Sequence, residues 1–368
     1  MSEPAGALAA PRSSRLLRPE RVKEATLLGI IALSVLVFGL LVEGYLSGRF
    51  FNRLTSSVVI VAILAAAQAL VIFSRNIDLS VGSIVGVGAY VTGDFLANTG
   101  ASPVIGMAVA MLVGAVLGSV NGALVAYGGV PAIIVTLGTL ALFRTLLSVY
   151  SGGANILAGD LPDWVLEFNN VTILSVGGFD LRLVFLIAVL VVVVLQWALG
   201  RLRWGRRLYA IGSNPAAAAQ AGLPTSSLVF WSFVGAGSLA GLAGLMFMAR
   251  AGTISATAGA GLELESVAAA VVGGVSILGG SGTMVGAFLG AVLIDTLKLS
   301  LVRVPEVSEF WRDAFLGILI LAAVILDTIL HQRFRRRWSA EARKAMEATG
   351  PTAVGMARIA GGGESADA

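Results

Sequence analysis

The chain has 368 residues, of which 57% are hydrophobic and 12% are charged, whereas ordinary soluble domains carry about 25% charged residues. This composition excludes an ordinary soluble domain, because only a bilayer can solvate so much apolar surface. Cysteine is absent and His331 is the one histidine, which excludes disulfides, thiolate metal sites and clusters of several histidines. The net charge of +4 comes from basic blocks beside apolar runs, a pattern typical of membrane orientation rather than of a nucleic-acid surface.

The N-terminal 24 residues form a basic tail, and an apolar run follows at residues 25–42. A secretory signal peptide also combines a basic region with an apolar run. We favour an uncleaved first helix, because the run is long, no clear small-residue cleavage site follows, and many spans come after it. The chain then divides into the cytoplasmic tail 1–24, a membrane domain 25–331 and a C-terminal tail 332–368.

Further apolar segments predict nine more membrane spans along the chain. They lie at residues 57–73, 81–96, 104–127, 132–149, 183–199, 228–249, 267–278, 284–301 and 314–330. A span needs about 20 mostly apolar residues, so the short, glycine-rich segment 267–278 is either a half-helix or part of a longer span. The predicted fold is an all-α, polytopic membrane bundle of about ten transmembrane helices.

The distribution of charge predicts the orientation of this bundle. With ten spans, the N-terminal tail, the basic loop 200–227 and the arginines of 333–337 all fall in the cytoplasm, as the excess of Lys and Arg in short cytoplasmic loops requires. The loop 151–180 then lies outside, and it contains acidic residues but no Lys or Arg. Both termini are therefore expected in the cytoplasm.

Two short matches suggest an internal repeat. The sequence GAVLG at Gly114–Gly118 is echoed by GAFLG at Gly286–Gly290, and Val130-Pro131 by Val304-Pro305, at offsets of about 172 and 174 residues. In the predicted topology these segments cross the membrane in opposite directions. The pattern predicts an inverted repeat, a common construction in transporters.

The loop 200–227 contains a short helix with both ends specified. Asn214 is a good N-cap and Pro215 suits the first helical position. Gly222 suits a left-handed C-terminal residue, and Pro224 prevents continuation. A helix of about two turns is not stable alone in water, so we expect it to pack on the membrane domain or on a partner. An ordinary surface helix between two spans is the alternative.

Polar residues in or beside the spans are candidate site residues. A neutral solute that carries hydroxyl groups would need hydrogen-bonding partners rather than counter-charges. The candidate pathway residues are Gln68, Asn121, Thr136, Thr139, Arg144 and Ser266. The candidate gate residues and helix breaks are Asp78, Ser80, Gly273, Gly274, Gly279 and Gly280. For Asp78 and Ser80 we favour a structural cap over a solute contact, and the glycine pairs permit bending and close helix approach.

Ionisable residues within predicted spans are costly and need an explanation. Asp295 and Lys298 are three residues apart on one helix, and we expect them to pair with each other. Asp94 is near the outer end of its span, where a solvated interface position is favoured. Arg144 faces a polar pathway, pairs with a carboxylate or reaches the interface, and the sequence leaves these alternatives open.

Four ordered stretches resemble the ATP-binding-cassette importer permeases of the ribose and branched-chain amino-acid class. They are NIDLSVGS (76–83), VPAIIVTLGTL (130–140), the loop 200–227 and the glycine-rich block 261–291. The resemblance covers roughly residues 55–330, and NIDLSVGS and IVTLGTL are closest in appearance to the rhamnose and autoinducer-two branch.

This resemblance implies a set of partners. They are a second permease copy or paralogue, separate ATPase subunits, and a periplasmic or lipid-anchored solute-binding protein. It also implies a coupling helix that docks in a groove of the ATPase. That helix would consist of Ser213, Asn214, Pro215, Ala216, Ala217, Ala218, Ala219, Gln220, Ala221 and Gly222.

The resulting expectation is a permease of the bacterial inner membrane for a monosaccharide-like solute such as rhamnose or ribose. We expect neither a cofactor nor enzyme chemistry in this chain, because the phosphate-binding pattern G-x-x-x-x-G-K-[ST] does not occur. One alternative is an ion-coupled secondary transporter with Asp295, Lys298 or Arg144 in a proton relay. Another is a branched-chain amino-acid permease of the same architecture. A membrane enzyme is more remote.

Overall fold

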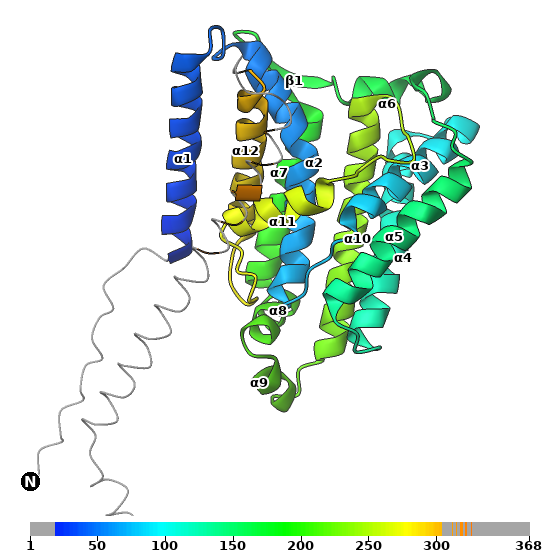
Figure 1. Ribbon diagram of the computed structural model, residues 1–368, viewed down its shortest axis with the longest axis vertical. Coiled ribbons are helices and arrows are strands. Elements are labelled where there is room, and N and C mark those ends of the chain that lie inside the picture. The colour runs from blue at the N-terminus through cyan, green and yellow to red at the C-terminus, as the bar shows by residue number, and fades with distance from the viewer. Residues whose placement is uncertain are drawn as a thin grey trace, which may run out of the picture. The chain divides into compact units, whose positions relative to one another are not determined.

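The computed structural model describes residues 19–303 and six single helical residues farther along, namely Trp311, Ala314, Gly317, Ile318, Leu321 and Ile325. The described part is helical apart from one hairpin (Figure 1). The long helices are α1 (Pro19–Leu41), α2 (Gly48–Phe73), α3 (Val81–Thr99), α4 (Pro103–Ala126), α5 (Ala132–Ser151), α7 (Leu183–Arg201), α10 (Thr225–Ala251) and α12 (Met284–Leu301). The short elements are a 3-10 helix (Ala158–Asp160), α6 (Asp163–Phe168), α8 (Arg203–Ser213), α9 (Pro215–Gln220), α11 (Leu262–Val272), β1 (Thr172–Val176) and β2 (Phe179–Arg182).

Seven helices in the described part of the chain are long and apolar enough to cross a membrane, namely α1, α2, α4, α5, α7, α10 and α12. The helix α3 is not among these seven, and α11 has only 11 residues, about 16 Å of helix against a hydrocarbon core of about 30 Å. The predicted span 314–330 lies outside the described residues except at single positions. A multi-pass helical protein is confirmed, and within residues 19–303, where nine of the ten spans are predicted, seven helices are candidate spans.

The predicted boundaries agree well with the observed ones for six helices. Both ends of α3, α4, α5, α7, α10 and α12 lie within three residues of their predictions. The helix α2 differs, because it begins at Gly48 rather than at residue 57. Its first turns expose Arg53 while Phe50 packs against Tyr45. These turns are amphipathic, so a search for continuous apolar runs misses them.

The predicted span 267–278 is wrong as a full span. The helix α11 begins earlier, at Leu262, and ends at Val272. The chain then continues without regular structure to Thr283, with left-handed backbone at Gly274, Gly279 and Gly280, a conformation that glycine adopts at little cost. The half-helix alternative describes this segment correctly, and α11 runs across the direction of α2 and α12 (Figure 1).

The expectation of an all-α fold is wrong in the loop 151–180. Strands β1 and β2 form an antiparallel hairpin in which Val176 pairs with Phe179. The two residues of its turn, Gly177 and Gly178, both have positive φ, of 58° and 81°, as a tight two-residue hairpin turn requires. The sequence TILSV-GG-FDLR carries this signal.

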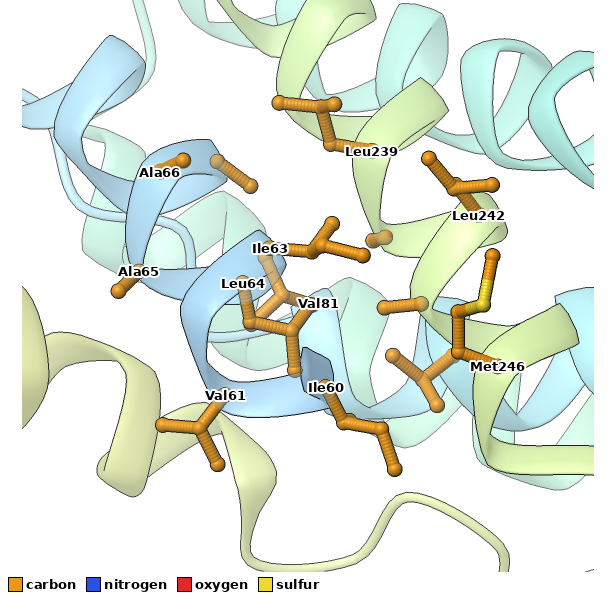
Figure 2. Close-up of a cluster of buried hydrophobic side chains, with 14 of the residues drawn as sticks. Ile60, Val61, Ile63, Leu64, Ala65, Ala66, Val81, Leu239, Leu242 and Met246 are labelled. Atoms are coloured by element: carbon orange, nitrogen blue, oxygen red, sulfur yellow. The ribbon is translucent and has the colours of Figure 1, made fainter. Parts of the chain in front are cut away.

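The core lies around α2, whose residues from 56 to 73 are all buried. This helix packs against α7, α10, α11 and α12. Figure 2 shows part of the α2–α10 contact, where Ile63 and Leu64 lie opposite Leu239, Leu242 and Met246. The central helix is thus shielded by its neighbours, which themselves carry the exposed apolar surface.

Helices α4 and α10 approach closely through glycine. Gly114 and Gly118 on α4 face Gly237 and Gly241 on α10, and a Cβ on any of the four would collide with the opposite backbone. Small residues permit such contacts in membrane bundles. The segment Gly286–Gly290 instead packs against the end of α11, and the inverted repeat stays a prediction.

Candidate functional site

Residues 74–80, which connect α2 to α3, are not helical and form a turn inside the bundle. Arg75 adopts a left-handed backbone with φ of 65°, and its N–H bonds to the carbonyl of Ile72 at 2.8 Å. This bond closes the last turn of α2. The chain then turns and begins α3 at Val81.

Asp78 and Ser80 organise this turn. The Oδ1 atom of Asp78 accepts hydrogen bonds from the backbone N–H of Ser80 at 2.8 Å and from its hydroxyl at 2.6 Å. The amide of Asn121 on α4 donates to the Ser80 hydroxyl at 2.7 Å. The amide of Gln68 on α2 donates to the carbonyl of Asp78. Asp78 and Ser80 therefore connect the turn before α3 to both α2 and α4.

The crossing cluster, as we call this group, is a set of five fully buried residues. It consists of Gln68, Asp78, Ser80, Asn121 and Thr136. The Thr136 hydroxyl on α5 donates to the carbonyl of Ile77 at 3.4 Å. The Oδ2 atom of Asp78 and the Oδ1 atom of Asn121 have no hydrogen-bond partner among the described residues. Both oxygens are therefore available as acceptors. A donor that reached them would be favoured, because an unpaired buried polar atom is costly.

Three of the predicted pathway residues lie outside the crossing cluster. The hydroxyl of Thr139 donates to Thr136 one turn earlier, at 3.4 Å. The guanidinium of Arg144 donates to the carbonyl of Ala258 at 2.8 Å. The hydroxyl of Ser266 donates to the carbonyl of Glu263 at 2.8 Å. Each of these side chains thus bonds to the protein's own backbone.

The expected pairing of Asp295 with Lys298 is wrong. The Nζ atom of Lys298 forms an ion pair with Oε1 of Glu265 on α11, at 2.5 Å. Asp295 is 2% exposed and hydrogen-bonds to Ser57 on α2. The rotation of α12 directs Lys298 to a partner on another helix, and residue spacing along one helix does not reveal that partner.

Asp94 lies partly buried near the C-terminal end of α3. Its carboxylate accepts hydrogen bonds from the Tyr150 hydroxyl at 2.7 Å and from the Asn98 amide at 3.2 Å. Neighbouring side chains therefore satisfy this carboxylate, and its position at the membrane interface stays a prediction.

The predicted short helix in the loop 200–227 is present as α9, preceded by the separate helix α8. The Oδ1 atom of Asn214 accepts a hydrogen bond from the N–H of Ala217 at 3.0 Å. Gly222 closes the other end with φ of 73°. Local sequence therefore predicted both ends of α9.

The helix α9 is attached to the membrane domain by one face only. Ala218 is 5% exposed and packs with Ile211 and Leu228. The remaining residues of α9 are exposed, namely Pro215, Ala216, Ala217, Ala219 and Gln220. The helix thus presents a row of small side chains on its outer face.

The helix α8 connects this region to the loop that follows α11. The Tyr209 hydroxyl donates to the carbonyl of Gly282 at 2.9 Å, and its ring lies 4.6 Å from that of Phe73 at the end of α2. The Ser213 hydroxyl bonds to the carbonyl of Gly280 at 3.4 Å. Tyr209 lies in an aromatic and basic stretch of the sequence, and its contacts with Gly282 and Phe73 are visible only in the structure.

The four candidate gate glycines have two different environments. Gly279 and Gly280 lie in the loop that α8 contacts, and a Cβ on Gly280 would collide with Ser213. Gly273 instead packs tightly against Gly286 on α12, and Gly274 lies beside Lys23. Of these four glycines, Gly280 is in contact with the segment predicted to couple to a partner, whereas Gly279 lies against Arg75.

A cavity of about 380 Å³ lies beside the contact between α8 and the loop that precedes α12. It is lined by Arg21, Glu24, Gln196, Tyr209, Gly280, Ser281, Gly282, Thr283 and Val285. Glu24 accepts a hydrogen bond from Thr283 at 2.6 Å, so the start of α1 is also joined to the loop. Among the described residues, no group of three or more His, Cys, Asp or Glu side chains could hold a metal ion.

Comparison with known proteins gave consistent matches. A family described as branched-chain amino acid transport system / permease component matches residues 50–324. A relative from Enterobacter sp. (strain 638) is 39% identical over 315 residues, which cover 84% of this chain and 87% of the relative. One from Yersinia pestis (strain Pestoides F) is 38% identical over 303 residues, covering 82% and 83%. Both are named autoinducer 2 import system permease protein LsrC. No solved structure gave a significant match.

Proposed function

The chain belongs to the branched-chain amino acid transport system / permease component family, and we propose that its solute is a monosaccharide-like molecule. It is a permease subunit of an ATP-binding-cassette importer and not an enzyme. The relatives reported above are import permeases for autoinducer 2. Their similarity over more than four fifths of the chain supports a sugar-like solute here.

The crossing cluster is the observation that carries this proposal. Its amide, hydroxyl and carboxyl groups are suited to the hydroxyl groups of a sugar. It contains no basic side chain that would pair with the carboxylate of an amino acid. The unpaired oxygens of Asp78 and Asn121 are acceptors for such hydroxyls once the surrounding helices separate. The amino-acid alternative is less well supported for this reason.

The proposed partner contacts follow from α8 and α9. An ATPase would dock on the exposed face of α9, and α8 would transmit its movement to the loop at Gly280 and Gly282 through Ser213 and Tyr209. A second permease copy and a solute-binding protein would complete the importer. The basic loops favour an orientation with both termini in the cytoplasm.

The solute is tested in proteoliposomes that contain this chain, its cognate ATPase and its cognate binding protein. Uptake of labelled rhamnose, ribose and leucine is measured with ATP inside the vesicles and without an ion gradient. We expect sugar uptake that depends on ATP. Uptake of leucine alone would establish the amino-acid alternative, and uptake that needs an ion gradient and no ATP would establish the ion-coupled one.

Substitution within the crossing cluster connects that result to the site. Asn121→Ala should raise the KM for the sugar while ATPase association is retained. Thr139→Ala, one turn from the cluster, serves as the matched control and should change the KM little. An unchanged KM in Asn121→Ala would remove the cluster from the pathway.

A further inference from the structure

One face of α7 is exposed and apolar throughout its second half. The side chains of Leu190, Val193, Val194 and Trp197 on this face are all about half exposed or more. They recur every three or four residues, which places them on one side of a helix. Arg201 is next at this spacing, is exposed, and ends the helix. Apolar side chains followed by Trp and then Arg are typical of a surface that runs from the acyl chains to the lipid headgroups.

A basic groove begins where this face ends. It has a volume of about 310 Å³ and is lined by Arg203, Arg206, Arg207, Ala210 and Leu223. The guanidinium of Arg206 donates a hydrogen bond of 3.0 Å to the backbone carbonyl of Arg201. The groove is therefore joined directly to the end of the lipid-facing surface of α7.

The rotation of α8 is determined by its other face. Leu208 and Ile211 are buried there, and Gly212 lies so close to the backbone of Phe73 and Gly280 that a Cβ would collide with both. The arginines of the opposite face are consequently held outward. These arginines are exposed because the packing of α8 fixes their direction, and not because they lie in a mobile loop.

The arginines are not neutralised within the described part of the chain. In residues 19–303 the one ion pair joins Lys298 to Glu265, so no described carboxylate pairs with the groove. The arginine fork matches the geometry of a phosphate group, to which it can donate two parallel hydrogen bonds. Basic pockets at membrane level favour anionic headgroups for this reason.

We propose that the groove formed by Arg203, Arg206 and Arg207 binds the headgroup of an anionic phospholipid whose acyl chains lie along α7. Continuity with the apolar face of α7 favours a lipid over an acidic protein surface. The small volume of the groove suits one headgroup. A lipid bound there would stabilise α8 at the contact that joins it to Tyr209 and the glycine loop.

The proposal is tested by native mass spectrometry of the full chain, released from micelles that contain equal amounts of phosphatidylglycerol and phosphatidylcholine. The wild type should retain phosphatidylglycerol preferentially. The triple variant Arg203→Gln, Arg206→Gln, Arg207→Gln should bind it about a hundredfold more weakly, since each arginine contributes about fivefold near a membrane surface. The triple Arg→Lys variant keeps the charge and should retain part of the preference.

The matched control is Arg49→Gln/Arg53→Gln, which removes two exposed arginines from the first turns of α2, at the opposite end of that helix from the α8 contact. It should retain phosphatidylglycerol as the wild type does. Equal retention of both lipids by the wild type, or unchanged retention by the triple Gln variant, would overturn the proposal. Loss of ATPase co-purification with retained lipid would show that the groove is a protein contact instead. If the triple Gln variant does not fold, the reduced preference for phosphatidylglycerol that is expected of the triple Lys variant is the test instead.

Discussion

The phenolic hydroxyl of Tyr209 donates a hydrogen bond of 2.9 Å to the backbone carbonyl of Gly282. This bond joins α8, which leads to the exposed helix α9, to the loop that connects α11 with α12. The ring of Tyr209 also contacts Phe73 at the end of α2. Movement of α8 would therefore be transmitted to α2 and to the loop that precedes α12.

Tyr209→Phe should uncouple ATP hydrolysis from transport. The substitution keeps the ring contact with Phe73 and removes the hydrogen bond, at a cost of about 1 kcal/mol in stability. We expect a lower ratio of solute transported to ATP hydrolysed in proteoliposomes, with ATPase association unchanged. Tyr150→Phe makes the same chemical change at Asp94 and should leave the ratio unaltered. An unchanged ratio in Tyr209→Phe would show that coupling takes another route.

Ala217→Arg should abolish co-purification of the ATPase subunit. Ala217 is exposed on α9, so a bulky charged side chain would obstruct a docked partner without disturbing the buried Ala218. The measurement is co-purification in detergent after expression with the genomic neighbours. Ala154→Arg, in the loop at the other end of the bundle, is the control and should retain the partner. Retention of the ATPase by both variants would contradict the role proposed for α9.

Asn214→Ala should loosen α9 without unfolding the membrane domain. Loss of the N-cap hydrogen bond to Ala217 costs about 1 kcal/mol, and α9 has only six residues. Hydrogen exchange of the amides of residues 216–220 should become faster, while exchange in α10 stays the same. Asn214→Asp preserves the acceptor and should exchange as the wild type does. Equal exchange in all three proteins would mean that packing of Ala218 alone holds the helix.

Gly241→Ala should destabilise the protein by about 1–3 kcal/mol, because the added Cβ would collide with the carbonyl of Ala110 on α4. Thermal unfolding in detergent measures this. Gly138→Ala on α5 is the matched control, since nothing lies within 4 Å of its Cβ, and it should be neutral or slightly stabilising. If Gly241→Ala were as stable as the control, the close contact of α4 and α10 would be wrong.

Lys298→Met should destabilise the protein by about 3 kcal/mol, because Glu265 would be left partly buried without its counter-charge. Adding Glu265→Gln should recover most of this loss. Adding Asp295→Asn instead should not, since Asp295 is not the partner of Lys298. Unfolding midpoints of the single and double variants give the coupling energy. Rescue by Asp295→Asn would restore the pairing along α12 that the structure contradicts.

Much of the fold was predictable from local sequence. The apolar runs gave the boundaries of six helices because each span needs its own stretch of apolar residues. The caps of α9 were readable from Asn214 and Gly222, since capping depends on neighbours in the chain. The hairpin at Gly177-Gly178 was equally readable and was missed because the all-α expectation left no place for strands.

The candidate site was predictable only in its composition. Gln68, Asn121 and Thr136 were selected as isolated polar residues in three different helices, and nothing in their spacing shows that they meet around Asp78 and Ser80. The role of Tyr209 was not foreseen for the same reason, because Gly282 is 73 residues away in the chain.

The sequence by itself determined that this chain is a multi-pass membrane protein of the permease family, with a short capped helix in a basic loop. Hydropathy, capping and ordered motifs are properties of short segments, so they can be read without a structure. The tertiary structure alone decided that Lys298 pairs with Glu265 and that α11 is a half-helix. It also decided that the polar residues of four elements form one buried cluster. These features depend on how each helix is rotated and packed against the others, and a periodic apolar sequence is compatible with many such rotations.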